Sequence, residues 1–263
     1  MKFARLMNKW VIISGASSGF GAAAARQFGA QGANVLLGAR RLDRLELVAA
    51  EARAAGAPVA LSHTLDVSST KSVEAFAQWV GRQAPHLDCL INNAGGAHGL
   101  DTVETGQDAD WEAMLQINLL SVLRMCRAFI PMLKQDPAGM IINIGSIAGR
   151  TAYEKGAAYC AAKAGELAIT RALRLELNGT GIRVGTIDPG MAETEFSMVR
   201  FKGDADKSAQ VYAGVEPLTA DDVAEAMVWV ASRPPHVNID EIVMKPTDQA
   251  EIYKVHRRTP PSR

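Results

Sequence analysis

The stretch that decides the fold reads Trp10-Val11-Ile12-Ile13-Ser14-Gly15-Ala16-Ser17-Ser18-Gly19-Phe20-Gly21. A short apolar run suited to a buried strand opens it, and an alanine-rich stretch suited to a helix follows at once. The glycines at 15, 19 and 21 let the backbone and the helix N-terminus approach a pyrophosphate. Three glycines can also serve a plain tight turn, but the strand before them and the helix after them favour a dinucleotide-binding loop.

Outward from this loop, short apolar runs alternate with longer amphipathic or alanine-rich stretches as far as about residue 190. Such alternation predicts a parallel sheet whose strands are joined by helices. Strands are expected at residues 10–14, 34–38, 58–62, 87–92, 139–144, 182–187 and 239–244. Helices are expected at 19–31, 41–55, 69–82, 108–133, 157–178 and 219–232. Because the strand runs are apolar throughout, helices should cover both faces, which predicts a Rossmann-type, doubly wound α/β fold with seven strands.

Composition narrows the class of protein. The 263 residues include 28 Lys and Arg against 28 Asp and Glu, and this neutral balance argues against nucleic acid or an anionic membrane as the main partner. The longest uncharged apolar stretch, residues 10–25, is shorter than the roughly 20 residues of a membrane span, so no transmembrane helix is expected. Three cysteines without a C-x-x-C pair and five scattered histidines predict neither disulfides nor a metal site. The expected location is cytoplasmic.

No repeat or low-complexity linker divides the chain, so we expect a single domain over residues 1–263. Residues 191–217 break the alternating rhythm, because they mix acidic and basic side chains with few apolar ones directly after the sixth predicted strand. Long insertions beside a site often act as lids, and we interpret this segment as a substrate lid. A plain solvent-exposed loop is the alternative. Residues 246–263 are expected to form a C-terminal tail.

The end of the second predicted strand indicates which dinucleotide is bound. An NAD enzyme places an acidic residue there against the ribose 2′-hydroxyl, whereas this chain reads Gly38-Ala39-Arg40-Arg41. Two guanidinium groups favour a 2′-phosphate, so the sequence predicts NADP. The alternative is that Arg41 merely begins the surface of the next helix, which is less plausible for Arg40.

The catalytic candidates follow the fifth predicted strand. Ser146 comes directly after that strand, Tyr159 lies in the next predicted helix, and Lys163 lies four residues further on. Positions i and i+4 of a helix share a face, so the hydroxyl and the ammonium can face one cleft. A free phenol has a pKa near 10, and a nearby ammonium favours its ionised form. Tyr159 would then exchange the alcohol proton while Ser146 holds the substrate oxygen.

Several motifs in their observed order resemble the short-chain dehydrogenase/reductase family. They are the G-x-x-x-G-x-G spacing at 15–21, Asn92-Asn93-Ala94-Gly95, Asn118, Gly145-Ser146 and Tyr159-x-x-x-Lys163. The resemblance runs from about residue 9 to 245 and implies a catalytic tetrad of Asn118, Ser146, Tyr159 and Lys163. It further implies that Lys163 holds the nicotinamide ribose and that Asn118 links Lys163 through water to solvent.

The cofactor contacts expected from these motifs extend over five loops and one helix. Asp66-Val67 matches the family position at the adenine ring, and the segment from Pro189 to Thr194 matches the one that passes the nicotinamide. The full set is Gly15, Ser17, Ser18, Gly19, Phe20, Gly21, Arg40, Arg41, Asp66, Val67, Asn93, Ala94, Gly95, Tyr159, Lys163, Pro189, Gly190 and Thr194.

The C-terminal third resembles one branch of that family, the NADP-dependent 3-hydroxy acid dehydrogenases, which include serine 3-dehydrogenase. The runs that carry this resemblance are Asp188 to Ser197, Val199 to Asp204, Val237 to Ile239 and Lys254 to Arg257. The branch implies a homotetramer that oxidises the 3-hydroxyl of serine, allo-threonine, 3-hydroxyisobutyrate or 3-hydroxypropionate, or reduces malonic semialdehyde. The expected partner is therefore a small hydroxy acid.

A small carboxylate substrate needs a cation near the hydride-transfer site, and arginine pairs with carboxylates in a bidentate manner. We predict Arg200 for this role, with Arg150 second, and a solvated surface arginine is the alternative for either. The charged stretch from Arg150 to Lys155 departs from the family pattern in the loop that shapes the substrate pocket, which leaves the exact substrate open.

Two other functions remain open from the sequence. A reductase of 3-ketoacyl groups or of a nonpolar ketone would use the same scaffold, although no basic patch suited to an acyl carrier protein is evident. A non-catalytic NADP-binding sensor is the more remote alternative, because such a protein should have lost Tyr159 or Lys163.

Overall fold

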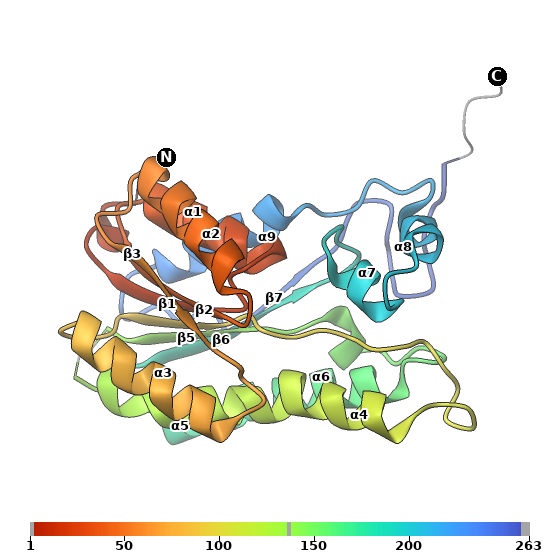
Figure 1. Ribbon diagram of the computed structural model, residues 1–263, viewed down its shortest axis with the longest axis horizontal. Helices are drawn as coiled ribbons and strands as arrows, with labels where there is room; N and C mark the ends of the chain where they lie inside the picture. Colours follow the sequence, from red (N-terminus) through yellow and green to blue (C-terminus); the bar gives the residue numbers. More distant parts are fainter. Residues whose placement is uncertain (1–2, 136–137, 259–263) are drawn as a thin grey trace.

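The computed structural model describes residues 3–135 and 138–258, and its strands form one parallel sheet flanked by helices (Figure 1). The order across the sheet is β3-β2-β1-β4-β5-β6-β7. The strands are β1 Trp10–Ser14, β2 Asn34–Ala39, β3 Ala60–Thr64, β4 Cys89–Asn92, β5 Met140–Ile144, β6 Arg183–Pro189 and β7 Glu241–Met244. The predicted seven-stranded, doubly wound α/β fold is confirmed.

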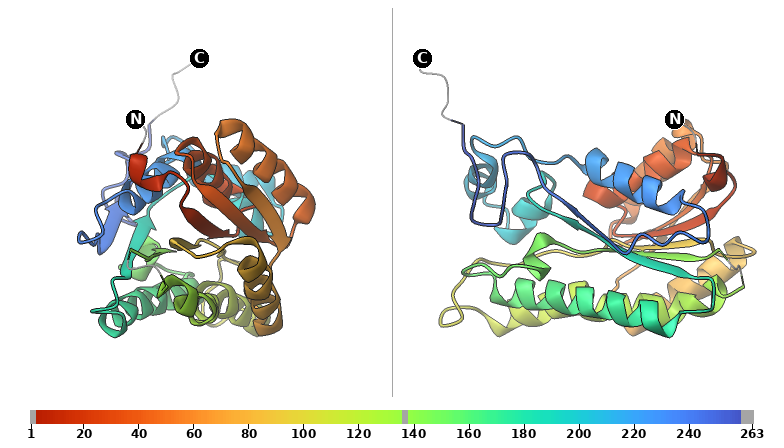
Figure 2. Two further views of the ribbon diagram at one scale, coloured as in Figure 1. Left: turned by 90° about the vertical axis from the view of Figure 1, so that its left-hand side faces the viewer. Right: turned by 180° about the vertical axis from the view of Figure 1, so that it is seen from behind.

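Helices cover both faces of this sheet in two layers (Figures 1 and 2). One layer holds α1 Gly19–Ala30, α2 Leu42–Ala55 and α9 Ala220–Ala231. The other holds α3 Thr70–Gln83, α4 Asp108–Leu115, α5 Ser121–Leu133 and α6 Ala157–Glu176. Alternate residues of β1 enter the two layers, since Val11 and Ile13 pack under the first and Ile12 under the second. Burial on both sides explains why this strand is apolar throughout.

The strand order places the site. The chain runs outward from β1 to β3 on one side and then returns to start β4 beside β1, with Val11 opposite Cys89. At such a switch point the loops after the two neighbouring strands diverge and leave a crevice at their carboxyl ends. The loops that begin at Gly15 and Asn93 therefore flank this crevice.

The helix predicted for residues 108–133 is continuous, but its middle is irregular. Between α4 and α5, residues Gln116–Leu120 form a π-helical turn, closed by the N–H of Ser121 on the carbonyl of Gln116. By length and composition alone the stretch Asp108–Leu133 could cross a membrane. In the structure α5 packs against α3, β4 and β5 as part of a helix layer.

The structure differs from the predicted elements in two places. β3 begins at Ala60 rather than at residue 58, because Pro58 has no N–H to donate to the ladder. The segment 191–217 contains two short helices, α7 Phe196–Arg200 and α8 Ala205–Tyr212, which lie beyond the carboxyl ends of the strands (Figure 1).

Candidate active site

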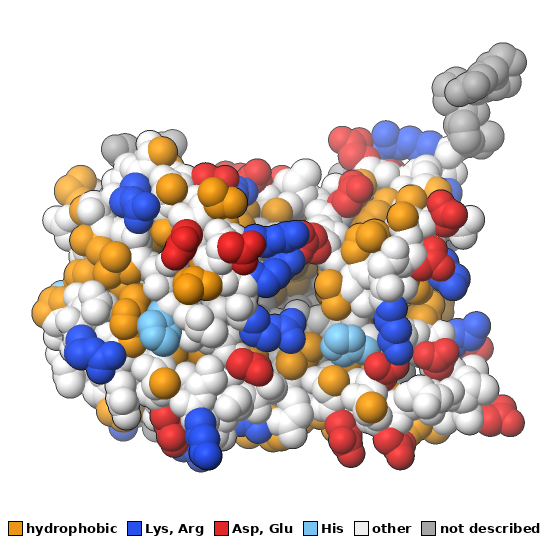
Figure 3. Space-filling model, in the orientation of Figure 1, with side chains coloured by type: hydrophobic (Ala, Val, Ile, Leu, Met, Phe, Trp, Pro, Cys, Tyr) orange, Lys and Arg blue, Asp and Glu red, His pale blue; other side chains and the backbone are white. Residues whose placement is uncertain are grey.

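A cavity of about 1100 Å³ opens at the carboxyl ends of the strands. Figure 3 shows a hollow on this face with basic side chains gathered at its mouth. Every residue predicted for the site lines the cavity except Gly21 and Arg150. The predicted loops and the helix that carries Tyr159 and Lys163 therefore converge on one space, as the carboxyl ends of parallel strands require.

The loops after β1 and β4 are held against each other at the floor of this cavity. The Ser14 hydroxyl oxygen accepts from the backbone N–H groups of Asn93 and Ala94, both at 3.1 Å. The Asn93 side-chain amide donates to the Ser14 carbonyl at 2.9 Å. Gly15 has φ of 66°, and a Cβ there would lie 2.8 Å from the Ala94 Cα. A Cβ on Gly21 would lie 2.6 Å from the Asn93 side-chain amide nitrogen. Gly21 does not line the cavity, but its lack of a side chain leaves room for the Asn93 amide.

The predicted 2′-phosphate position is basic and lies at the cavity mouth. Arg41 Nη2 donates to the hydroxyls of Ser18 at 2.8 Å and Ser17 at 3.1 Å. Arg40 is exposed and lines the same part of the cavity. The guanidinium of Arg41 is therefore held beside the glycine-rich loop, where a phosphate group on the ribose would need it.

An unpredicted carboxylate joins segment 191–217 to this basic position. Glu195 lies 2.9 Å from Arg41 and also accepts from Arg44. Partial burial acts to raise the pKa of Glu195. Hydrogen bonds from Arg44 and Arg41 outweigh this effect and hold that pKa below its ordinary value. Arg44 could have been found from the sequence, because it stands one helical turn beyond Arg41 and shares its face.

At the adenine end, the loop after β3 is fixed by its own hydrogen bonds. The Asp66 carboxylate accepts from the Ser68 hydroxyl at 2.7 Å and from the Ser68 N–H at 3.0 Å. These bonds hold the pKa of Asp66 below its usual range despite partial burial. Asp66 and Val67 both line the cavity, as predicted.

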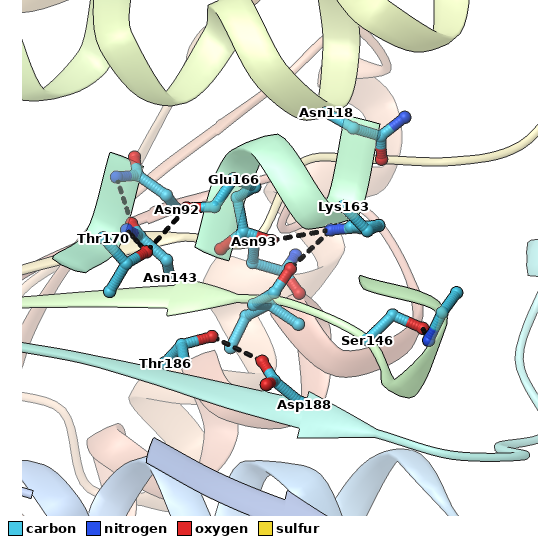
Figure 4. A network of polar contacts seen from close by, with 12 residues as sticks. Asn92, Asn93, Asn118, Asn143, Ser146, Lys163, Glu166, Thr170, Thr186 and Asp188 are labelled. Atoms are coloured by element: carbon cyan, nitrogen blue, oxygen red, sulfur yellow. Dashed lines mark hydrogen bonds and ion pairs between the residues drawn. The ribbon is translucent and has the colours of Figure 1, made fainter. Parts of the chain in front are cut away.

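The catalytic candidates line the same cavity. Tyr159 and Lys163 lie one turn apart on α6 with exposed fractions of 8% and 6%. Ser146 begins a short 3₁₀ turn, Ile147–Gly149, and its hydroxyl oxygen accepts from the Ala148 N–H at 3.1 Å. Figure 4 shows Ser146 and Lys163 beside the end of the same strand, β5. Ser146, Tyr159 and Lys163 thus line one cavity.

The π-helical turn places Asn118 inside this site. Its Oδ1 accepts from the Gly96 N–H at 3.1 Å, and its Nδ2 donates to the carbonyls of Gly96 and Met114, both at 2.8 Å. Gly95 lies between Asn118 and Lys163, because a Cβ on Gly95 would lie 2.7 Å from Asn118 Oδ1 and 3.8 Å from Lys163 Nζ. Asn118 thus fixes the loop after β4 directly beside Lys163.

Arg200, at the end of α7, reaches Tyr159. Its guanidinium carbon lies 5.4 Å from the ring centre of Tyr159, 5.3 Å from Phe196 and 5.6 Å from Tyr153. It also donates to the Tyr153 hydroxyl, whose pKa burial raises to about 12. Its buried Nε has no hydrogen-bond partner within the described part of the chain. Arg200 therefore places a cation over the ring of Tyr159 and has one further donor without a partner in the described residues.

Arg150, the second candidate for the substrate carboxylate, does not line the cavity. The 3₁₀ turn after Ser146 directs it to β6 and β7, where it donates to Asp188 and Glu241, each at 2.6 Å. Hydrogen bonds from Arg171 and Arg150 lower the pKa of Glu241 to about 2. The charge of Arg150 is thus used within the fold.

Comparison with known proteins extends over nearly the whole chain. The short chain dehydrogenase family matches residues 9–205. An NADP-dependent 3-hydroxy acid dehydrogenase of Schizosaccharomyces pombe is 39% identical over 256 residues, 97% of this chain and 98% of that protein. A sulfoacetaldehyde reductase of Chromohalobacter salexigens is 39% identical over 245 residues, 93% of this chain and 96% of that protein. The closed form of serine dehydrogenase complexed with NADP+ has a TM-score of 0.87 at 37% identity, covering 95% of this chain and all of that one.

Proposed function

The chain belongs to the short-chain dehydrogenase family, and from this membership we propose that it transfers hydride between NADP and the 3-hydroxyl or 3-oxo carbon of a small hydroxy acid. Serine, allo-threonine, 3-hydroxyisobutyrate, 3-hydroxypropionate and malonic semialdehyde are substrates of this kind. The relatives support an acid, because one is named for 3-hydroxy acids and another for sulfoacetaldehyde, which carries a sulfonate.

The residues present fit NADP. Gly15 brings the backbone to the cavity floor without a side chain in the way, and Arg40 and Arg41 offer two cations at the ribose end. No acidic residue stands at the end of β2, where an NAD enzyme would use one against the ribose 2′-hydroxyl. When bound, NADP accepts or supplies the hydride.

The chain's own residues handle the proton and the substrate oxygen. In oxidation, Tyr159 takes the proton of the alcohol, and in reduction it returns a proton to the forming alkoxide. Ser146 donates to the same oxygen and stabilises the charge that develops on it. Lys163 holds the nicotinamide ribose and favours the phenolate form of Tyr159 through its positive charge.

The observation that carries the substrate class is Arg200. A guanidinium stacked on the ring of Tyr159, with a buried donor left over, suits a carboxylate two carbons away from the reacting hydroxyl. A nonpolar alcohol would leave this donor without a partner. The segment 191–217 supplies both Arg200 and Glu195, and this supports its role as a lid. We expect backbone hydrogen exchange in this segment to be slower when NADP is bound, and an unchanged rate would contradict the lid role.

The test of this function is a panel of initial rates. Purified protein is assayed with NADP⁺ or NAD⁺ and with L-serine, L-allo-threonine, 3-hydroxyisobutyrate, 3-hydroxypropionate or one nonpolar secondary alcohol. We expect turnover of one or more hydroxy acids with NADP⁺. Activity confined to the nonpolar alcohol would overturn the substrate class, and activity confined to NAD⁺ would overturn the cofactor.

Replacing Arg41 by alanine is expected to raise the KM for NADP⁺ by about 10- to 30-fold, because a charge-assisted contact to phosphate is lost. The KM for NAD⁺ should change little. Arg44→Ala is the matched control, since Arg44 also pairs with Glu195 but does not line the cavity. If Arg44→Ala raised the KM as much, the bridge to Glu195 rather than a phosphate contact would explain the effect.

We further propose a cytoplasmic homotetramer. Large apolar side chains stand exposed on the outward faces of the second helix layer, namely Leu115 on α4, Leu123 on α5 and Leu175 on α6. Contacts between copies of the chain would cover such side chains. Light scattering should give about four times the chain mass of 28.1 kDa, and a monomer would contradict the proposal.

A further inference from the structure

A carboxylate is buried beside the catalytic lysine. Glu166 lies on α6 one turn beyond Lys163, and only 1% of its side chain is exposed. Its Oε2 is 3.4 Å from Lys163 Nζ. Its Oε1 is also buried and has no hydrogen-bond partner among the residues that the structure describes. A glutamate in such a place is costly unless its charge is matched, so its presence calls for a role.

Lys163 is the cation in contact with this carboxylate. Figure 4 shows Lys163 Nζ pointing to Glu166 and to the end of β5, where it donates to the Ile144 carbonyl at 2.6 Å. An ammonium has three N–H donors, and these two acceptors occupy two of them. The third is left for the cavity that Lys163 lines. Glu166 therefore helps to fix the direction in which Lys163 faces the cofactor position.

Other ionisable groups near Glu166 come from three elements. Asp188 on β6 is a second buried carboxylate, but it accepts from Thr186 at 2.6 Å and pairs with Arg150. Cys126 on α5 is fully buried, and burial raises the pKa of its thiol to about 12, so it is neutral. Tyr159 lies one turn before Lys163 on α6 itself. Lys163 and Tyr159 are thus the pair on which a charge at Glu166 acts.

The two buried charges stabilise each other. Burial raises the pKa of Glu166, and the ammonium of Lys163 opposes this rise. Burial likewise acts to lower the pKa of Lys163, but the negative charge of Glu166, followed by that of the Tyr159 phenolate, outweighs burial and the pKa is raised. Each group thus favours the charged form of the other.

We propose that Glu166 is a positioning residue: it is the internal counter-ion of Lys163, and it sets how strongly the ammonium favours the phenolate of Tyr159. The inference rests on the proposed function, in which Tyr159 exchanges the substrate proton. With Glu166 ionised, the ammonium is partly compensated and its effect on Tyr159 is moderated. Without that charge, the full ammonium acts on Tyr159 and the phenolate forms at lower pH.

The first test is the pH dependence of kcat/KM for oxidation of the best hydroxy acid. In Glu166→Gln, which keeps the shape and an acceptor, we expect the acidic limb to move down by about one pH unit. In Glu166→Leu, which also removes the acceptor, the KM for NADP⁺ should rise several-fold in addition, because Lys163 is less well held. Glu176→Gln, at an exposed position on the same helix, is the matched control and should change neither the acidic limb nor the KM for NADP⁺. A folded Glu166→Gln variant with an unmoved acidic limb would overturn the proposal.

The second test needs no turnover. Lys163→Met leaves the Glu166 carboxylate buried and unpaired, so the folded state binds a proton more tightly than the unfolded one. Its thermal unfolding midpoint should therefore fall as pH rises from 6 to 8, by about 5 °C more than that of Lys163→Met/Glu166→Gln. Equal pH dependence in the two variants would show that Glu166 is no counter-ion. If no substrate were turned over but the two variants differed, the proposed reaction alone would have failed.

Discussion

Replacing Tyr159 by phenylalanine is expected to lower kcat for hydroxy acid oxidation by about 10³-fold, because the group that exchanges the alcohol proton is lost. The ring that contacts Phe196 and Arg200 remains, so the cavity keeps its shape. The dissociation constant for NADPH, measured by fluorescence, should change by less than about threefold, since the glycine-rich loop and the two arginines are untouched.

Tyr253→Phe is the matched control, because this tyrosine also lines the cavity but is 67% exposed, and its hydroxyl only accepts from the Glu154 N–H. Its kcat should stay near that of the unaltered protein. Turnover that survives in Tyr159→Phe would show that another group exchanges the proton, whichever substrate is used.

Removing the Arg200 side chain is expected to lower kcat/KM for the hydroxy acid by about 100-fold, mainly through KM. The proposed charge-assisted pair with a carboxylate would be lost from a partly buried position, which corresponds to about 3 kcal/mol. A nonpolar alcohol of similar size should lose little, because it never used the guanidinium. Steady-state kinetics with both substrates measure this difference directly.

Arg150→Ala is the control for the Arg200 variant, because it shows whether the loss of another nearby arginine also lowers kcat/KM. Asp188, with 2% of its side chain exposed, would lose its cation, and breaking a buried pair of this kind destabilises the fold by about 3 kcal/mol. Denaturant unfolding should detect that loss, while the KM for the hydroxy acid stays within about twofold. A raised KM in Arg150→Ala together with an unchanged KM in Arg200→Ala would reverse the two assignments.

Local patterns were enough to predict the sheet, and the resemblance to a known family supplied most of the site. Buried parallel strands require apolar runs and crossover helices require amphipathic ones, so both were visible in the sequence. The motif positions came from that resemblance, and strand geometry explains why they meet, since parallel strands bring their carboxyl ends to one edge. Asn93 and Ser146 are examples that line the cavity as expected.

What the sequence did not reveal depends on where side chains point after the chain has folded. Arg150 follows Ser146 closely, but a single 3₁₀ turn directs it to β7. Glu195 meets Arg44 across 151 positions of sequence, a distance at which spacing carries no information. Glu166 was within reach of sequence reasoning, because it stands three residues after Lys163 on one helical face. It was missed because a glutamate on a helix is ordinarily solvated.

The π-helical turn at Gln116–Leu120 limits which changes the helix can accept, because the direction of the Asn118 side chain depends on it. Deleting one residue there would give an ordinary α-helix, with better hydrogen bonds than a π turn allows. It would also rotate α4 against α5 by about 100°, the turn contributed by one residue. Asn118 would then leave Gly96, and the loop beside Lys163 would lose its anchor. A redesign that selected only for helix regularity would stabilise this segment and disable the site.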